Sequence, residues 1–273
     1  MLFIRFKHLK KQTLCELTES WSMMEILTLC FFAFIAGFID SIVGGGGLIQ
    51  TPALLITLPN VPVPPIMGTA KISSIAGSMM SSFQYALRVK FNWRVLLTTI
   101  IAAGIGAFIG ARLISFLHPS VVKPVIFVML ILVFTYLIIK KDFGQSNKMV
   151  VTDSKSIVYC ILFGFIVGVY DGFLGPGTGS FLILFFVSVV GFDFLMASAH
   201  AKVVNLATNL GAVIYFGWSG NIMWHYALPM AFCNLSGAFF GSKAALLRGN
   251  EFVRQVFLGV IFLMIIRYGF DIF

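Results

Sequence analysis

The feature that most limits how this chain can fold is an apolar unit that is interrupted by glycines, carries charged residues and occurs twice. Each copy contains an aspartate, a glycine-rich interruption and a lysine, in the order Asp40, Gly44–Gly47 and Lys71, then Asp171, Gly175–Gly179 and Lys202. The two aspartates are 131 positions apart, and so are the two lysines. Other residues keep this spacing, so we interpret the chain as an internal duplication.

The composition excludes a water-soluble fold. Of the 273 residues, 59% are apolar and only 11% are charged, and the mean hydropathy is +0.99. Soluble domains contain about 25% charged residues, so most of this surface must face something other than water. The apolar runs are continuous, whereas the strands of a membrane β-barrel alternate in polarity. The sequence therefore predicts an all-α, polytopic integral membrane protein.

The apolar segments divide the chain into two halves of similar plan. We place them at 23–43, 47–58, 65–87, 95–117 and 124–139, and again at 156–175, 179–190, 195–217, 226–247 and 255–272. A membrane-spanning helix needs about 20 residues, and the second segment of each half is shorter than that. The first two segments of each half are therefore expected to form a discontinuous helix or a re-entrant hairpin. The predicted organisation is a polar, basic segment at 1–22, repeat 1 at 23–140, a basic connecting loop at 141–155 and repeat 2 at 156–273.

Duplicated halves related by a pseudo-two-fold axis are typical of membrane transporters. If each broken pair of segments crosses the membrane once, the N-terminus and the loops at 88–94 and 140–155 share one side, as the positive-inside rule favours. If each half crosses the membrane an odd number of times, the two repeats are inverted relative to each other. The 140–155 loop is then cytoplasmic only if the N-terminus lies on the opposite, external side. The motifs GAFIG at 106–110 and GAFFG at 237–241 are typical of close helix packing.

Other classes of function lack their usual residues. The net charge of +9 comes mainly from lysines and arginines in short connections, which is typical of membrane loops rather than of a nucleic-acid surface. The four cysteines form no C-x-x-C pair, and the four histidines show no metal or haem spacing. No nucleophile with its base is visible. We expect no enzyme activity, no cofactor and no bound metal.

The two glycine-rich interruptions are the first candidate binding elements. Each glycine destabilises a helix by about 1 kcal/mol relative to alanine, and Pro176 also removes a backbone donor. Unwound backbone at membrane depth persists where it is buried in protein or lines a wet cavity. The helix that resumes after each interruption offers free N–H groups and a positive dipole end, which favour an anion; a structural kink is the alternative. The candidate substrate-binding residues here are Gly45, Gly46, Gly47, Gly177, Thr178 and Gly179.

Two lysines lie within the apolar segments themselves. Burying an ammonium at the bilayer centre costs at least about 2.5–3.5 kcal/mol on insertion scales, so such a residue is a functional candidate. At helical spacing each lysine shares a face with two polar residues: Lys71 with Ser74 and Ser78, and Lys202 with Asn205 and Asn209. These side chains are predicted to bind the substrate. The alternatives are that a lysine snorkels to an interface or pairs with an aspartate.

The aspartates Asp40 and Asp171 stand just before the interruptions. Each is expected to neutralise a lysine when the site is empty, to carry the proton that couples transport to a gradient, or to cap the broken helix. Tyr170 adds a hydrogen-bonding group beside Asp171, as do Gln50 and Thr51 in the first half. His200 lies two residues before Lys202 on a different face of the helix. It is a candidate for titration near neutral pH, although we favour a hydrogen-bonded core histidine.

These motifs resemble a known family. GFIDSIVGGGGLIQTPAL in the first half, and GVYDGFLGPGTGSF with ASAHAKVVNLATNLG in the second, look like the TauE/SafE sulfite exporter family, also called TSUP. The resemblance extends over residues 25–270 and implies a bacterial inner-membrane permease that moves sulfur-containing anions, often outward. Carried over by position, its polar cluster would contain the glycines after each aspartate and Asp40, Thr69, Lys71, Asp171, His200, Lys202, Asn205 and Asn209. Ala70 stands where relatives often have an asparagine.

We therefore predict a secondary transporter that exports small sulfur-containing anions, such as sulfite, sulfoacetate or organosulfonates, by alternating access. The alternatives are an anion channel and a transporter of another small carboxylate or oxyanion. The expected partners are the anionic solute, the lipid bilayer, H⁺ as coupling ion and a second copy of the chain in a homodimer. Nucleic acid is not an expected partner, and the predicted location is the bacterial inner (plasma) membrane.

Overall fold

The computed structural model describes residues 23–114 and 154–272, and this part of the chain is helical without strands. Its helices are α2 (Met23–Val43), α3 (Gly47–Thr57), α4 (Val63–Ala86), α5 (Trp93–Leu113), α7 (Ser154–Phe173), α8 (Thr178–Phe185), the π-helical turn η1 (Phe186–Val190), α9 (Phe194–Trp218) and α10 (Trp224–Ile272). The all-α prediction is confirmed. Three predicted segments lie wholly or mostly outside the described residues: 1–22, 124–139 and the loop at 141–155, of which only the end is described.

Local residue chemistry explains where several helices begin and end. The Asn92 and Asp193 side chains accept the N–H groups of Val95 and Met196, which caps the starts of α5 and α9. The predicted segments 226–247 and 255–272 are joined in α10, but Gly249 has non-helical dihedral angles (φ 73°, ψ −161°). α10 therefore has two helical parts, one on each side of Gly249.

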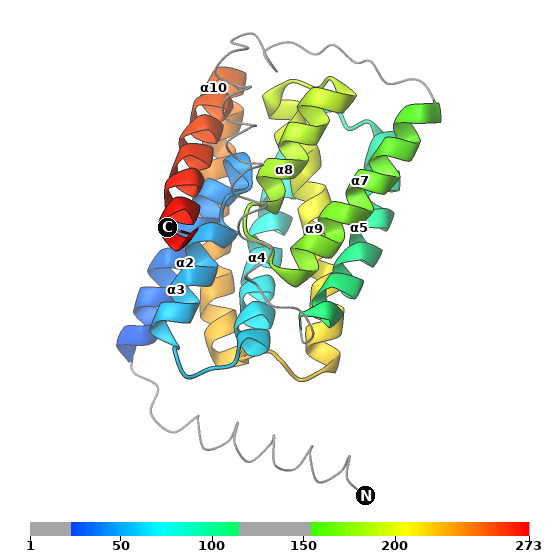
Figure 1. The fold of residues 1–273 in the computed structure, drawn as a ribbon. Coiled ribbons are helices and arrows are strands. Elements are labelled where there is room, and N and C mark those ends of the chain that lie inside the picture. Colours follow the sequence, from blue (N-terminus) through cyan, green and yellow to red (C-terminus); the bar gives the residue numbers. More distant parts are fainter. Residues whose placement is uncertain (1–22, 115–153, 273) are drawn as a thin grey trace, which may run out of the picture.

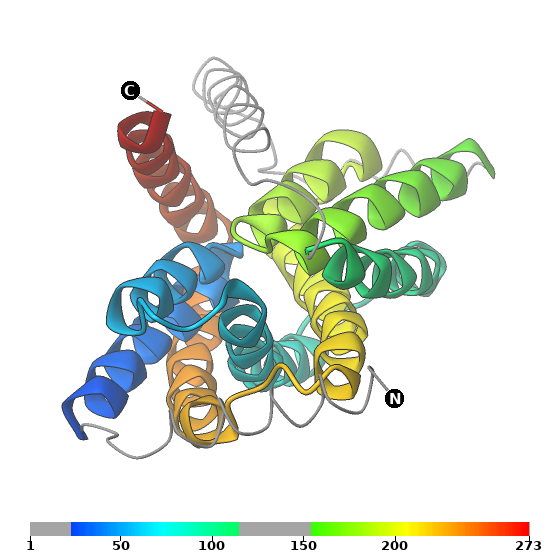
Figure 2. The ribbon, with the colours of Figure 1, turned by 60° about the horizontal axis from the view of Figure 1, so that its bottom comes forward.

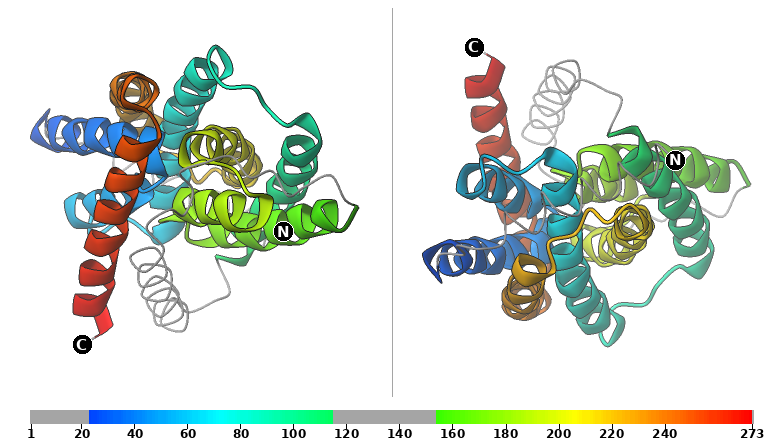
Figure 3. Two further views of the ribbon diagram at one scale, coloured as in Figure 1. Left: turned by 90° about the horizontal axis from the view of Figure 1, so that it is seen from above. Right: turned by 90° about the horizontal axis from the view of Figure 1, so that it is seen from below.

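The helices form a bundle with the polar helices in its middle. In Figures 1 and 2, α4 and α9 lie between a group of α2, α3 and α10 and a group of α5, α7 and α8, and Figure 3 shows the same order from above and below. α2, α5 and Trp224–Leu263 of α10 are long and apolar enough to cross a membrane. Large apolar side chains are exposed on these outer helices, among them Phe31, Ile101 and Phe232. A surface of this kind suits lipid, and the protein is an integral membrane protein.

Each half packs its first helix against the last described helix of the other half. α2 lies against α10, and α7 lies against α5. A Cβ at Gly237 would meet the carbonyl oxygen of Phe34, and a Cβ at Gly106 would meet that of Phe165. Both glycines and both phenylalanines are 131 positions apart, so the contacts are equivalent. The glycines of GAFIG and GAFFG thus let helices approach closely, as expected, and these matched contacts support the predicted duplication.

The two broken segments enter the bundle from opposite ends. In Figure 1, α2 begins at the lower end and α3 returns to it, whereas α7 begins at the upper end and α8 returns there. Both are therefore re-entrant hairpins, and equivalent helices of the two halves run in opposite directions. The alternative with one crossing per broken pair does not match this arrangement. The loop after α4, with Arg88 and Lys90, lies at the end opposite to the start of α2. This position agrees with the alternative in which the repeats are inverted and the N-terminus lies on the side of the membrane opposite to the basic loops.

Candidate functional site

The helices break at both predicted interruptions, and in each half the first helix is followed by a glycine in the same backbone conformation. Gly44 and Gly175, which are 131 positions apart, both have φ of +81°, a left-handed conformation that glycine adopts without strain. The Gly44 N–H donates to the Asp40 carbonyl oxygen at 2.8 Å, and the Gly175 N–H donates to that of Tyr170 at 3.2 Å. These glycines end α2 and α7 with the backbone bonds usual at helix C-termini.

The two hairpins meet at their breaks in the interior of the bundle. Gly44, after α2, contacts Gly179, in the first turn of α8, so closely that neither position has room for a Cβ. Gly47, which begins α3, lies against Pro176. Two helix C-termini and two helix N-termini are thereby brought together.

Each buried lysine pairs with the aspartate of the other half. The Lys71 Nζ lies 2.7 Å from Asp171 Oδ2, and the Lys202 Nζ lies 3.0 Å from Asp40 Oδ2. The lysine side chains are only 9% and 0% exposed, so neither snorkels to an interface. Each ammonium lies near the C-terminal end of the partner's helix, where the helix dipole also favours a cation. Both lysines are thus stabilised without a solute.

A cavity lies between the two breaks. It is small: the centre of a water-sized sphere can occupy about 40 Å³ of it. Its polar lining comes from α2, α3, α4, α7, α8 and α9 and consists of Asp40, Gln50, Thr51, Lys71, Ser74, Asp171, Thr178, Asn205 and Asn209. Four glycines and three apolar residues complete it: Gly44, Gly47, Gly175, Gly179, Met67, Ala70 and Leu174.

The structure places nine of the predicted site residues on this lining, from both halves of the chain. They are Asp40, Gly47, Lys71, Ser74, Asp171, Thr178, Gly179, Asn205 and Asn209. Seven others lie outside the lining: Gly45, Gly46, Ser78, Tyr170, Gly177, His200 and Lys202.

Several residues outside the lining hold it in position. Lys202 lies behind Asp40, which also accepts the Gly46 N–H at 3.2 Å through Oδ1. The Tyr170 hydroxyl donates to the Pro176 carbonyl oxygen at 2.5 Å and so fixes the turn between α7 and α8. Ser78 is buried in α4, and its hydroxyl has no hydrogen-bond partner among the described residues.

His200 is in α9 and lies away from the cavity, against the start of α5. Its Nε2 accepts the Asn92 N–H at 3.0 Å, and its Nδ1 lies 2.8 Å from the Met196 carbonyl oxygen, so Nδ1 is the donor of a neutral ring. Phe91, Phe186 and Phe192 surround the ring. These contacts fit the hydrogen-bonded core histidine, and its position lends a coupling role no support.

A buried network around Gln50 was only partly expected. Gln50 Nε2 donates to the Ala70 carbonyl oxygen at 2.9 Å, and Gln50 Oε1 accepts from the Ser73 hydroxyl at 3.1 Å and from Asn234 Nδ2 at 2.8 Å. The network ties α3 to α4 and α10. Ser73 and Asn234 were not candidates, because Ser73 is not on the helix face that Lys71, Ser74 and Ser78 share and Asn234 is not close in sequence to a lysine that was expected to be buried. Met67, Ala70 and Leu174 were missed because apolar residues carry no signal of a site.

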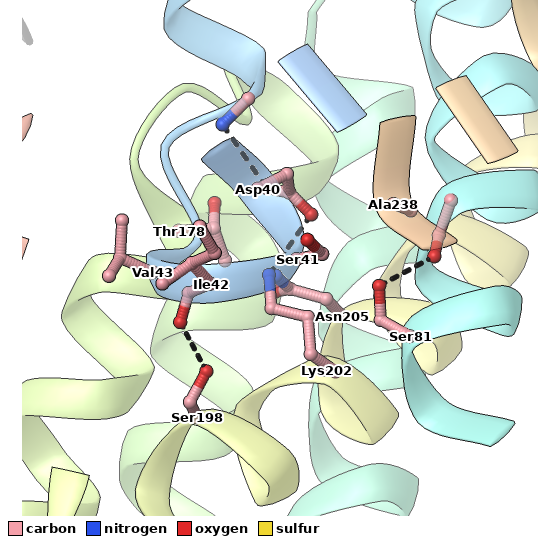
Figure 4. Close-up of polar contacts among 12 residues, drawn as sticks. Asp40, Ser41, Ile42, Val43, Ser81, Thr178, Ser198, Lys202, Asn205 and Ala238 are labelled. Carbon is pink, nitrogen blue, oxygen red and sulfur yellow. Dashed lines mark hydrogen bonds and ion pairs between the residues drawn. The ribbon is translucent and has the colours of Figure 1, made fainter. Parts of the chain in front are cut away.

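Three hydroxyl groups cap the broken end of α2, where helix carbonyls lose their usual partners. Tyr85 donates to the Ser41 carbonyl oxygen at 2.9 Å, Ser198 to that of Ile42 at 2.5 Å and Ser180 to that of Val43 at 3.0 Å. Figure 4 shows Ser198 pointing at Ile42, with Lys202 and Asn205 beside Asp40. The donors come from α4, α9 and α8, so the end of α2 is fixed from three directions.

Asn205 is the clearest sign that the cavity takes a polar ligand. Its Oδ1 is buried and has no hydrogen-bond partner among the described residues, although the residue lines the cavity. Its amide nitrogen lies against Gly179. A buried acceptor without a donor costs about 1–3 kcal/mol, which a hydroxyl group of a ligand or a water molecule in the cavity would offset. Together with Lys71 and the N-terminus of α8, this amide surrounds a space suited to a small, polar, charged molecule.

Comparisons with known proteins give a consistent result. A family profile described as "Sulfite exporter TauE/SafE" matches residues 29–268. The chain is 35% identical over 235 residues to probable membrane transporter protein ORF9 of Sinorhizobium sp, covering 86% of this chain and 88% of the relative. It is 31% identical over 253 residues to a probable membrane transporter protein of Haemophilus influenzae, covering 91% and 96%, and 29% identical over 243 residues to YfcA of Escherichia coli K12, covering 89% of each. No solved structure matches.

Proposed function

The chain belongs to the sulfite exporter TauE/SafE family of membrane transporters, and from this premise we propose that it exports small sulfur-containing anions as a secondary transporter. Sulfite, sulfoacetate and organosulfonates are the proposed solutes. The proposed location is the bacterial inner membrane. The family and the relatives are transporters rather than enzymes.

The observation that carries this proposal is the set of donors around the cavity. Lys71 supplies an ammonium, α8 supplies the positive end of its dipole at Gly179, and Asn205 supplies the Nδ2 donor of its amide. A sulfonate or sulfite group presents two or three acceptor oxygens to such donors. The donors sit inside a bundle with a lipid-facing surface, where their interaction with an anion is weakened little by water.

The arrangement of the hairpins supports alternating access as the proposed mechanism. The α2–α3 hairpin and the α7–α8 hairpin enter from opposite ends and meet at the cavity. We propose that displacement of one hairpin, with Gly44 or Gly175 as hinge, opens the cavity to one side of the membrane at a time. Transporters built from inverted halves move in this general way around a fixed central site.

Flux of labelled isethionate, sulfoacetate and sulfite in proteoliposomes tests the proposal. We expect saturable flux, and we expect Lys71→Ala to lower it at least about 10-fold, because a hydrogen bond to a charged group contributes about 1.5–3 kcal/mol. Lys90→Ala, which removes an exposed lysine from the loop before α5, is the matched control and should transport normally.

Three outcomes would count against the proposal. Undiminished flux in both Lys71→Ala and Lys202→Ala would show that the site is elsewhere. Flux that never saturates would indicate an anion channel. Preference for a carboxylate or another oxyanion over every sulfonate and sulfite would assign the protein a different solute.

A further inference from the structure

The two ion pairs have equivalent partners but different surroundings. We infer that they have different functions: the solute opens the Lys71–Asp171 pair, and Asp171 takes up one proton as it does so, whereas the Lys202–Asp40 pair stays closed. This inference rests on the proposed function, because it describes how that same cavity accepts an anion.

The charges around the cavity require compensation when an anion enters. Lys71 from α4, Asp40 from α2 and Asp171 from α7 line it, and Lys202 from α9 lies directly behind Asp40. The lining residues from α3 and α8, namely Gly47, Gln50, Thr51, Thr178 and Gly179, carry no charge. The Tyr85 hydroxyl, near Asp40, is bonded to the Ser41 carbonyl oxygen.

These four charged side chains add up to zero. A monoanion would therefore leave one uncompensated negative charge inside the protein, which is costly in a low-dielectric interior. Protonation of one carboxylate removes that charge. The cavity is thus suited to a monoanion that enters together with a proton.

Exposure decides which of the two lysines meets the solute. The Lys71 side chain lines the cavity and is 9% exposed, whereas Lys202 is 0% exposed and is separated from the cavity by Asp40. A solute oxygen can therefore replace Asp171 as the counter-ion of Lys71. Asp171 is itself only 6% exposed, so once Lys71 pairs with the solute the Asp171 carboxylate would be a buried charge without a counter-ion. Asp40 keeps both Lys202 and the Gly46 N–H.

The exchange is balanced in charge and in bonds. The Lys71–Asp171 ion pair breaks, and an ion pair forms between Lys71 and the solute. The Asp171 carboxylate takes one proton from water on the side to which the cavity is open. The solute and the four side chains together then carry no net charge, as before binding. Release on the other side reverses each step, so transport is electroneutral, and its direction is set by the gradients of the solute and of the proton together.

A second observation separates the two pairs. The α2–α3 hairpin, which carries Asp40, is fixed to the rest of the bundle by hydrogen bonds from Tyr85 and Ser198 and by the network of Gln50, Ser73 and Asn234. At the five equivalent positions, 131 residues away, the chain has only apolar residues: Phe216, Met67, Phe181, Val204 and Ala103. The α7–α8 hairpin, which carries Asp171, therefore lacks these buried bonds. Its displacement breaks fewer hydrogen bonds, so its ion pair is the one free to open.

The test measures protons and solute in the same proteoliposomes. Isethionate, a monoanionic sulfonate, is the probe, pyranine reports internal pH, and potassium with valinomycin sets the membrane potential. For the wild-type protein we expect one proton to move with each isethionate and no effect of potential on the rate. For Asp171→Asn, which mimics the protonated acid, we expect isethionate exchange to continue without proton movement.

Asp40→Asn is the matched variant in the other pair. It leaves Lys202 buried without its partner, so we expect less folded protein, with any remaining flux still coupled to protons. Isethionate flux without protons in the wild-type protein would overturn the inference and leave the proposed function intact. Uncoupling by Asp40→Asn but not by Asp171→Asn would also overturn it. Failure to move any of the tested anions would instead refute the proposed function, and the inference with it.

A binding measurement covers the case in which Asp171→Asn fails to fold. Purified wild-type protein in weakly buffered detergent should take up one proton per molecule when isethionate is added, because the bound and free states differ by that proton. Binding of isethionate without proton uptake would overturn the inference.

Discussion

Gly44 and Gly179 lie in contact, so that a Cβ on either residue would collide with the backbone of the other. One residue ends the first broken helix, and the other lies in the first turn of the helix after the second break. Their contact joins the two hairpins beside the cavity. The geometry of the site therefore depends on two positions without side chains.

Gly179→Ala is expected to destabilise the protein by about 1–3 kcal/mol, because the added methyl group overpacks this contact and forces the backbones apart. Thermal unfolding in detergent measures the change. Gly104→Ala in α5 is the control, since its Cβ would meet only the Ala207 carbonyl oxygen at 3.6 Å. It should be neutral or slightly stabilising. Equal melting temperatures for the two variants would contradict the contact.

Lys202→Ala is expected to cost about 3–5 kcal/mol of stability, because it leaves the Asp40 carboxylate partly buried without its counter-ion. The double variant Lys202→Ala/Asp40→Ala should be more stable than the single variant, since no uncompensated charge remains. Melting temperatures of the single and double variants form a mutant cycle. Additive losses would mean that the two side chains are not coupled.

Tyr85→Phe is expected to cost about 1–3 kcal/mol, because it leaves the buried Ser41 carbonyl oxygen at the end of α2 without its donor. Tyr159→Phe in α7 is the matched control, because that ring is 54% exposed. Thermal unfolding of the two variants makes the comparison. A loss at Tyr159 as large as that at Tyr85 would argue against the capping role.

The orientation in the membrane follows from the charges on the loops. Arg88 and Lys90 lie in the loop at the upper end in Figure 1, whereas the loops at 58–62 and 219–223, at the lower end, carry no charged residue. Applied to these described loops, the positive-inside rule predicts that the upper end faces the cytoplasm, whereas the basic segment at 1–22, which precedes α2, favours the opposite orientation. In a variant without the four native cysteines, Asn60→Cys should react with an impermeant maleimide in intact cells. Lys90→Cys should react only after permeabilisation, and the reverse pattern would invert the assignment.

Much of the fold could be predicted because its signals are local. The apolar run at 23–43 coincides with α2, and the glycines at 44–47 and 175–179 mark both breaks, because glycine and proline disfavour a helix whatever surrounds them. Lys71 and Lys202 could be recognised as buried from the length and apolarity of their segments. The lining by Met67 and the capping by Tyr85 could not be predicted, since neither residue differs in sequence from ordinary core residues.

The sequence by itself determined that the chain enters a membrane, where its helices break and which charges are placed in an apolar environment. Only the tertiary structure decided which lysine pairs with which aspartate, that the hairpins enter from opposite ends, and that Lys71 but not Lys202 reaches the cavity. The reason is physical. The cost of burying a charge or unwinding a helix is set by the nearby chain, whereas the partner that offsets this cost comes from the other half and is fixed by packing.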